Sequence, residues 1–345
     1  MNEADARALI AAGLGEAAGR DARLGAVRRG AVAEVRFFEW RGRPLLLRRR
    51  RAGAAFGYEP GLAKEPAVAA AWAARGAAAG AVGAGQAAAQ GRPAPGRLPH
   101  GPALLASGHG ARPWSIQEAV AGPALGAAPR PEAYRRLGAQ LAELHALPLP
   151  GFAATFHDLA RPAEPARLFA EDLECALEAA ARAAALPASL AARLRRLARA
   201  DLARADFAGA RPALCHNDLH GLNVLAGRGG EPVLIDWDNA VLRPAELDLV
   251  KLRHWTALDG AGVLAAAPAL YEAFRDGYET AGRAEGSGPP DPDRLRACEL
   301  LWLLRVLAFE AGREAAGRAP AAPFPAAAAY RARLEELAER GEERA

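Results

Sequence analysis

The stretch from Leu214 to Asp236 constrains the fold of this chain more than any other part of the sequence. It reads L-C-H-N-D-L-H-G-L-N-V-L-A-G-R-G-G-E-P-V-L-I-D, a polar loop followed by two short apolar pieces with a glycine-rich turn between them. Three of the four asparagines of the chain, Asn217, Asn223 and Asn239, lie in or beside it. The pattern predicts two short strands, with polar side chains before the first and after the second.

The loop residues His216, Asp218 and Asn223 have the spacing H-x-D-x-x-x-x-N, and Asp236 ends the second apolar piece. This is the layout of a kinase catalytic loop followed by a metal-binding aspartate. Phosphoryl transfer from ATP requires a carboxylate that receives or orients the acceptor hydroxyl, and oxygen ligands that hold Mg²⁺. Asp218 suits the first role, and Asn223 and Asp236 suit the second.

We expect His216 to brace this loop, because Asp218 already supplies the carboxylate. The alternative is a polar loop between strands in which the aspartate and asparagine side chains only cap turns.

The N-terminal third of the chain favours strands. Two apolar runs, 32–40 and 44–51, flank Arg41-Gly42-Arg43, which predicts a β-hairpin. Residues 65–75 are alanine-rich with a proline near the start, which predicts a helix. We expect a loop at 83–100 and two further strands at 102–107 and 114–120.

From Glu132 onward the leucine spacing is typical of amphipathic helices. We predict helices over 134–147, 168–182 and 190–202, and helices that resume after the central strands at about Glu246, Leu264, Leu295 and Ala327.

Length and composition exclude several classes of protein. With 345 residues, of which 51% are hydrophobic, the chain can form one large domain or two lobes. The net charge of +4 does not favour a nucleic-acid partner. Three cysteines without a C-x-x-C pair argue against a disulfide framework and favour a reducing cytoplasm. The first twenty residues do not resemble a signal peptide, and we expect no membrane span.

Several segments resemble the aminoglycoside phosphotransferase and choline kinase superfamily. They are C-H-N-D-L-H-G-L-N-V-L, L-I-D-W-D and R-P-A-E-L-D-L in the central stretch, L-A-E-L-H-A-L at 141–147 and Q-E-A-V-A-G at 117–122. The resemblance implies a bilobal, protein-kinase-like α+β fold with ATP between the lobes. We expect a small antiparallel-sheet N-lobe at 1–117, a hinge at 118–122 and a larger, mainly helical C-lobe at 123–345.

The resemblance also implies roles for single residues. Asp218 corresponds to the catalytic base, with His216 in the same loop, and Asn223 and Asp236 correspond to the Mg²⁺ ligands. Asp248 corresponds to an aspartate that steadies the catalytic loop. The hinge backbone at Gln117, Glu118 and Ala119 corresponds to the adenine contact. The implied reaction is ATP- and Mg²⁺-dependent phosphorylation of a hydroxyl on a small molecule, either an aminoglycoside-like antibiotic or an amino-alcohol metabolite.

One departure concerns the basic residue that contacts the phosphates. Only two of the 44 basic residues are lysines, Lys64 and Lys251, and neither lies on the second strand. Arg48 is the best substitute, paired with Glu65 of the following helix, and Arg50 shares its strand face. Arginine is not a neutral replacement for lysine, so a non-catalytic, nucleotide-binding pseudokinase is an alternative.

Two further alternatives stay open. The run Arg48 to Arg51 is either the solvated end of a strand or a nucleic-acid patch. The tryptophans Trp237, Trp255 and Trp302 are either core residues or an aromatic cage for a quaternary amine.

Overall fold

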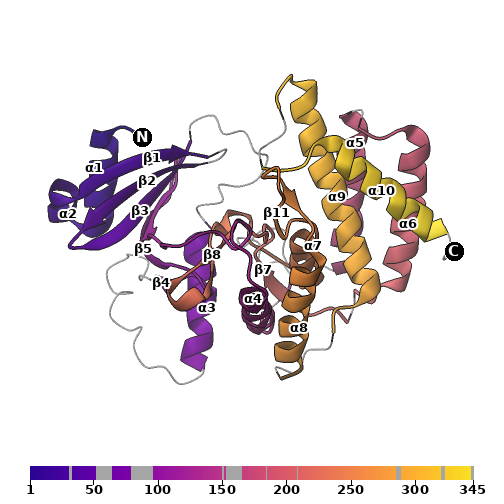
Figure 1. The fold of residues 1–345 in the computed structure, drawn as a ribbon, viewed down its shortest axis with the longest axis horizontal. Coiled ribbons are helices and arrows are strands. Elements are labelled where there is room, and N and C mark those ends of the chain that lie inside the picture. Colours follow the sequence, from indigo (N-terminus) through magenta and orange to yellow (C-terminus); the bar gives the residue numbers. More distant parts are fainter. Residues whose placement is uncertain are drawn as a thin grey trace. The chain divides into compact units, whose positions relative to one another are not determined.

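The computed structural model describes residues 1–30, 33–51, 64–78, 96–149, 151–152, 165–183, 185–207, 209–284, 289–319 and 323–342. The chain divides into two compact units, each described by itself below (Figure 1). The first contains Met1–Pro123 and Leu225–Ala240, and the second contains Ala124–Val224 and Val241–Ala345. Most of the predicted loop at 83–100 lies outside the described residues.

The first unit is built on an antiparallel sheet with the strand order β1-β2-β3-β6-β5-β4. Its strands are β1 (Arg23–Arg29), β2 (Ala33–Trp40), β3 (Arg43–Arg50), β4 (Gly96–Arg97), β5 (Ala103–Gly108) and β6 (Trp114–Glu118). The predicted hairpin is confirmed as β2 and β3. Its two turn residues have positive φ angles, 51° at Arg41 and 70° at Gly42, as a tight hairpin turn requires.

Two helices that the sequence analysis did not predict, α1 (Glu3–Leu14) and α2 (Glu16–Asp21), pack on one face of this sheet (Figure 1). Ile10 of α1 is buried together with the strand residues Leu45 and Leu47. Because side chains alternate along a strand, Arg48 points to the opposite face. That face meets α3 (Glu65–Ala78), which confirms the predicted helix.

The second part of the first unit returns to it from the middle of the chain. It holds β8 (Val224–Ala226) except for its first residue, β9 (Pro232–Leu234) and two short 3-10 turns, η4 (Arg228–Gly230) and η5 (Trp237–Asn239). The two predicted short strands are therefore confirmed. The Leu234 N–H donates to the His100 carbonyl at 2.9 Å, and the Lys64 ammonium donates to the Ala240 carbonyl at 3.2 Å. These bonds fasten the segment to the N-terminal part of the same unit.

The second unit is mainly helical. Its helices are α4 (Pro131–His145), α5 (Pro165–Arg182), α6 (Ala188–Arg204), α7 (Glu246–His254), α8 (Pro268–Ala284), α9 (Pro292–Ala315) and α10 (Ala327–Glu342). Two antiparallel pairs accompany them, β7 (Pro212–Cys215) with β10 (Val241–Pro244), and β11 (Ala257–Leu258) with β12 (Leu264–Ala265). Together with the antiparallel sheet of the first unit, these helices confirm the predicted α+β class.

One helix start was predicted wrongly. Leu264 begins the two-residue strand β12 and not a helix. The residues of β12 pair with those of β11, and the Leu264 N–H donates to the Pro323 carbonyl. The helix α8 begins at Pro268, where proline is favoured in the first turn.

The core of the second unit is formed mainly by α5, α6, α9 and α10. Trp255 and Trp302 belong to it, with exposed fractions of 5% and 4% and ring centroids 4.9 Å apart. Trp237 is fully buried in the first unit. These burials favour core packing for all three tryptophans over a cage open to a ligand. None of the helices within the described ranges has the length and hydropathy that crossing a membrane requires.

Candidate active site

The predicted site residues form two groups. Arg48, Glu65, Gln117, Glu118, Ala119 and Asp236 lie in the first unit, and His216, Asp218 and Asn223 lie in the second. We call Arg48, Glu65, Asp236 and Asp238 the arginine cluster, and residues 216–223 the catalytic loop.

Arg48 joins three carboxylates. One guanidinium nitrogen pairs with Glu65, and the other lies 2.7 Å from Asp236 Oδ1 and 3.1 Å from Asp238 Oδ2. A planar guanidinium can make such contacts at once, whereas an ammonium is a point charge. Burial by itself would lower the pKa of Arg48, but Asp238, Glu65 and Asp236 outweigh it and raise that pKa. Arg48 is therefore a permanent cation here, placed where the resemblance expects a lysine.

Glu65 is held on both of its oxygens. One contacts Arg48, and the other accepts a hydrogen bond of 2.6 Å from the Gln117 amide, which also lies 3.2 Å from Ser115 Oγ. Glu65 is completely buried, in the first turn of α3, where a negative charge is favoured. The Gln117 side chain thus orients Glu65, a role that its position in the predicted hinge did not indicate.

One backbone group of the predicted hinge is hydrogen-bonded to the neighbouring strand β3. The Ala119 N–H donates to the Pro44 carbonyl at 3.0 Å, and the Glu118 side chain pairs with Arg43 at 2.8 Å. In an extended chain the backbone groups of successive residues point in opposite directions. The backbone groups of Glu118, the last residue of β6, therefore face the other edge, away from β3.

Asp236 and Asp238 differ in their surroundings. Asp236 has a left-handed backbone with a φ of 64° and a side chain that is 43% exposed, whereas the Asp238 side chain is 12% exposed. Burial raises the pKa of Asp238 to about 8, and the charges of Asp236 and Glu65 add to this increase against the opposing effect of Arg48.

Even with Asp238 protonated, the arginine cluster holds more negative than positive charge, because Glu65 and Asp236 share one guanidinium. A hard divalent cation binds carboxylate oxygens, and Asp236 offers an accessible one. The donor set fits Mg²⁺.

The catalytic loop of the second unit holds Asp218 from several sides. Asp218 Oδ1 lies 2.9 Å from the Lys251 ammonium, and the Asn223 amide nitrogen lies 3.0 Å from the Asp218 carbonyl and 3.4 Å from Oδ2. Burial by itself would raise the pKa of Asp218, but Lys251 and the neighbouring His220 outweigh it and hold that pKa well below its usual range. The side chain is still 24% exposed, so an ionised carboxylate is accessible to a substrate.

The orientation of Asn223 also suits its predicted role. Its amide nitrogen is directed at Asp218, so its amide oxygen is the atom that faces away. An amide oxygen is a ligand that Mg²⁺ accepts.

His216 and Asp248 brace the loop. The fully buried His216 accepts the Asp218 N–H on its Nδ1 at 3.3 Å. Asp248, also fully buried, accepts the N–H groups of His216 and Asn217, both at 2.6 Å. Asn217 has a left-handed backbone with a φ of 58°, so these bonds stabilise a conformation that asparagine tolerates better than most residues. These contacts suit the bracing roles that the sequence analysis expected of both residues.

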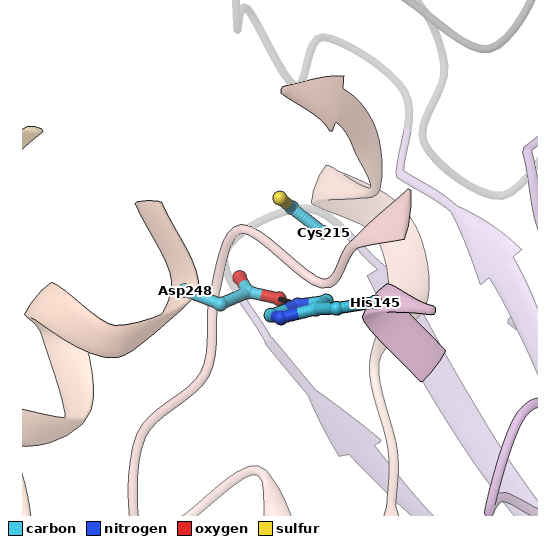
Figure 2. Close-up of side chains that lie close together, drawn as sticks. All are labelled: His145, Cys215 and Asp248. Carbon is cyan, nitrogen blue, oxygen red and sulfur yellow. Dashed lines mark hydrogen bonds and ion pairs between the residues drawn. The ribbon is translucent and has the colours of Figure 1, made fainter. Parts of the chain in front are cut away.

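His145, Cys215 and Asp248 come together beneath the loop (Figure 2). His145 Nε2 lies 3.2 Å from Asp248, and its Nδ1 lies 2.9 Å from the Tyr278 hydroxyl. Burial raises the pKa of the Cys215 thiol well above its usual value, so the thiolate that a metal would need is disfavoured. Both Asp248 oxygens already accept backbone N–H groups. The cluster is a hydrogen-bond network that supports the loop.

Gly221 is required by close backbone contacts. A Cβ atom at this position would lie 2.1 Å from the Thr256 carbonyl oxygen, and the Gly221 N–H donates to the Trp255 carbonyl at 3.0 Å. The glycine of H-G-L-N therefore lets the loop pack against the chain that follows α7.

Several acidic residues on helices of the second unit, whose charges could attract a cationic acceptor, are paired with arginine. Asp172 lies 3.0 Å from both Arg243 and Arg305, and Glu174 lies 2.7 Å from Arg195. Glu171 and Glu310 likewise pair with an arginine on their own helices. Their charges are largely compensated.

The contacts of Lys251 and Asp238 and the side-chain roles of Gln117 and His145 were not predicted from the sequence. One signal was available for Lys251, because a lysine is rare in this chain. Asp238 stands two residues after a predicted metal ligand, but nothing in the sequence indicates that it contacts Arg48.

Comparison with known proteins identifies the fold and the family. No curated protein matches the chain. Among solved structures, the aminoglycoside phosphotransferase APH(4)-Ia aligns with a TM-score of 0.58 at 17% identity, over 97% of this chain and 98% of that one. A putative aminoglycoside phosphotransferase from Ralstonia eutropha aligns with a TM-score of 0.58 at 16% identity, over 93% and 92%.

A third structure, the spectinomycin phosphotransferase APH(9)-Ia in complex with ADP and spectinomycin, aligns with a TM-score of 0.52 at 16% identity, over 93% of this chain and 88% of that one. At these identities the likeness concerns the fold, and it confirms the predicted kinase-like α+β architecture. A sequence profile of the phosphotransferase enzyme family matches residues 24–298, which is most of the chain. The chain therefore belongs to the phosphotransferase enzyme family and is a small-molecule phosphotransferase.

Proposed function

We propose that this protein transfers the γ-phosphoryl group of ATP to a hydroxyl group of a small molecule, in the presence of Mg²⁺, with Asp218 as the catalytic base. The observation that carries this proposal is the state of Asp218. Its carboxylate is ionised, partly exposed, and held between the Lys251 ammonium and the Asn223 amide. A carboxylate in this state can orient an acceptor hydroxyl and take its proton.

In the proposed reaction, the acceptor oxygen forms a bond to the γ-phosphorus as the bond between that phosphorus and the leaving oxygen of ADP breaks. The hydroxyl proton passes to Asp218, which later releases it to solvent. Asp236 and the Asn223 amide oxygen would hold Mg²⁺. When bound, the ion neutralises charge on the phosphates and orients them. Arg48, oriented by Glu65, would contact a phosphate.

The nucleotide proposal has support from related folds. Solved structures of APH(4)-Ia hold ADP or AMP-PNP together with hygromycin B. We propose that the adenine contacts the hinge backbone at 117–119. The Ala119 N–H is already bonded to the Pro44 carbonyl, so the backbone of Glu118 is better placed for this contact than that of Ala119.

The acceptor is proposed as a class. Hygromycin B and spectinomycin, which the related structures contain, are hydroxylated molecules. We propose a hydroxylated small molecule, either an aminoglycoside-like antibiotic or an amino-alcohol metabolite, and no nucleic-acid partner. All three cysteines are free, which suits the proposed cytoplasmic location.

One observation favours a second candidate, a nucleotide-binding pseudokinase. Arg48 lies 2.7 Å from Asp236, so it occupies an oxygen of the proposed metal ligand. Against this, Arg48 contacts only one oxygen of Asp236, and the hydrogen bonds from the Asn223 amide nitrogen to Asp218 support the roles proposed for these two residues.

The test is Mg²⁺-dependent release of ADP from ATP, with the wild type and Asp218→Asn compared across aminoglycosides, other hydroxylated antibiotics, choline, ethanolamine, homoserine, thiamine and sugar amines. We expect one acceptor class to stimulate the wild type, and Asp218→Asn to lower turnover by about 10²- to 10⁴-fold. MgATP binding, measured by calorimetry, should persist in the variant. Equal turnover of the two proteins would refute Asp218 as the base, and MgATP binding without turnover on any acceptor would favour the pseudokinase.

A further inference from the structure

We propose that Lys251 is a positioning residue for phosphoryl transfer, one that fixes the orientation of the Asp218 carboxylate. This inference rests on the proposed function, because it takes Asp218 to be the base. No part of the resemblance assigned a role to Lys251.

The geometry places Lys251 against the loop at two points. Its ammonium lies 2.9 Å from Asp218 Oδ1 and also donates to the Asn217 carbonyl. The side chain is 15% exposed, so the contact is largely protected from solvent. An ion pair of this kind is screened less by salt than one on the surface.

The helix α7 supplies both ends of this support. Asp248 lies in its first turn and accepts the Asn217 N–H, and Lys251, three residues later on the same helix face, binds the Asn217 carbonyl. One rigid helix therefore holds both backbone groups of the left-handed residue that precedes Asp218.

These contacts assign different roles to the two oxygens of Asp218. Lys251 holds Oδ1, and the Asn223 amide nitrogen lies 3.4 Å from Oδ2. We infer that Oδ2 faces the acceptor hydroxyl and receives its proton as the new oxygen–phosphorus bond forms and the bond to ADP breaks. Without Lys251 the carboxylate can rotate, and misplacement of a reacting group by about 1 Å costs about 10²-fold in rate.

The residue type supports a specific role. Only two of the 44 basic residues are lysines, and one of them occupies this position. A compact ammonium with three donors can bind a carbonyl and a carboxylate oxygen from one point, whereas a planar guanidinium needs more room. We therefore expect that arginine cannot replace Lys251.

The first experiment compares wild type, Lys251→Met and Lys251→Arg. ADP release from MgATP is measured with the acceptor that the panel identifies and with water alone, MgATP affinity by calorimetry without acceptor, and Tm by differential scanning fluorimetry. We expect kcat to fall about 10- to 100-fold in Lys251→Met, with MgATP affinity within about 2-fold of the wild type, and little recovery in Lys251→Arg. Arg253→Met is the matched control, because Arg253 lies on the same helix but pairs with Glu299. It should leave kcat unchanged.

The double variant Lys251→Met/Asp218→Asn tests whether Lys251 acts through Asp218. If it does, the double variant should be no slower than Asp218→Asn alone, because effects within one unit are not additive. Additive losses would overturn the proposal, as would a wild-type kcat in Lys251→Met while Asp218→Asn is inactive. Full activity of Asp218→Asn would instead refute the proposed function itself.

A chemical rescue covers the case in which Lys251→Met does not fold. Lys251→Cys is prepared in a Cys175→Ser background, because Cys175 is exposed whereas Cys215 and Cys298 are buried. Alkylation of the thiolate by 2-bromoethylamine displaces bromide and forms a thioether that restores an ammonium near the position of Nζ. We expect kcat to rise at least about 10-fold on alkylation, with Tm unchanged. Equal kcat before and after complete alkylation would overturn the proposal.

Discussion

The arginine cluster of the first unit and the catalytic loop of the second hold their carboxylates with opposite balances of charge. In the arginine cluster, Glu65, Asp236 and Asp238 share one guanidinium, and the pKa of Asp238 is raised to about 8. In the catalytic loop, Asp218 lies beside Lys251, and its pKa is held well below its usual range. The two groups of carboxylates are therefore suited to different tasks.

A surplus of negative charge favours the arrival of a cation, and an ionised carboxylate with its own cation is ready to orient a hydroxyl. Under the proposed function, the carboxylate ligand of the metal belongs to the arginine cluster and the catalytic base to the catalytic loop, and the basic residue beside each carboxylate differs accordingly. A guanidinium spans several carboxylates, whereas an ammonium positions one.

The largest effect that tests this division is the loss of Asp236. We expect Asp236→Ala to lower phosphoryl transfer by at least about 10²- to 10³-fold, because a fixed charge beside the phosphates is lost. Unlike Asp218→Asn, it should also abolish the Mg²⁺ dependence of ATP binding in calorimetry. Wild-type MgATP affinity in Asp236→Ala would show that the metal is held elsewhere.

Replacement of Arg48 tests the need for a guanidinium. Arg48→Ala leaves Glu65 and Asp238 without their main cation, and breaking a buried pair in this way costs about 3–5 kcal/mol in the free energy of unfolding. Arg48→Lys should fall between this variant and the wild type in urea unfolding and in MgATP affinity. If Arg48→Lys equals the wild type in both measurements, a point charge is sufficient in the arginine cluster. The two groups would then not differ in the kind of basic residue that they need.

The pH dependence of stability tests the raised pKa of Asp238. Because this pKa is about 8 in the folded protein against 3.8 for the unperturbed group, the folded state binds the proton more tightly. Its contribution to stability is therefore present below about pH 4 and decreases as the pH rises toward 8.

We expect Tm of the wild type to fall by about 4–6 °C from this source between pH 5 and pH 8, because these two pKa values imply a loss of roughly 3–4 kcal/mol over that range. In Asp238→Asn the decrease in Tm should be smaller. The Tm of the variant should therefore rise relative to that of the wild type as the pH approaches 8. Parallel Tm curves for the two proteins would contradict the assignment, and scanning fluorimetry in matched buffers is sufficient to decide.

The smallest effect belongs to an arginine outside both groups. Arg195 pairs with Glu174 at 2.7 Å, but the two side chains are 37% and 48% exposed. Arg195→Ala should leave both the urea unfolding midpoint and turnover close to those of the wild type, because solvent screens this pair. A large loss would show that the surface arginines of this chain contribute more than their exposure suggests.

Local patterns in the sequence were sufficient for most of the fold. The Arg41-Gly42 turn and the apolar runs beside it predict the hairpin, because turn geometry and strand alternation depend on neighbouring residues. The helix expected at Leu264 failed for the opposite reason. Its strand partner Ala257–Leu258 is near in the sequence, but the Leu264 N–H donates to the carbonyl of Pro323, which is far away.

The same distinction applies to the candidate site. His216, Asp218 and Asn223 could be predicted because they lie within one short loop. The contact between Lys251 and Asp218 spans 33 residues and depends on how α7 packs against the loop. The contacts of Arg48 with Asp236 and Asp238 span 188 and 190 residues. No spacing rule connects positions so far apart, so these partners required the structure.

Because Leu225–Ala240 belongs to the first unit, this unit can be completed only after the middle of the chain has been synthesised. Arg48 is synthesised 188 residues before Asp236. At about 5–20 residues per second, roughly 10 to 40 s of translation separate them. During that time the N-terminal strands emerge from the ribosome with Arg48 lacking two of its three carboxylate partners. The part of the protein that is made first is thus completed only after much of the helical unit has been synthesised, and a fragment that ends at Pro123 lacks residues that this unit needs.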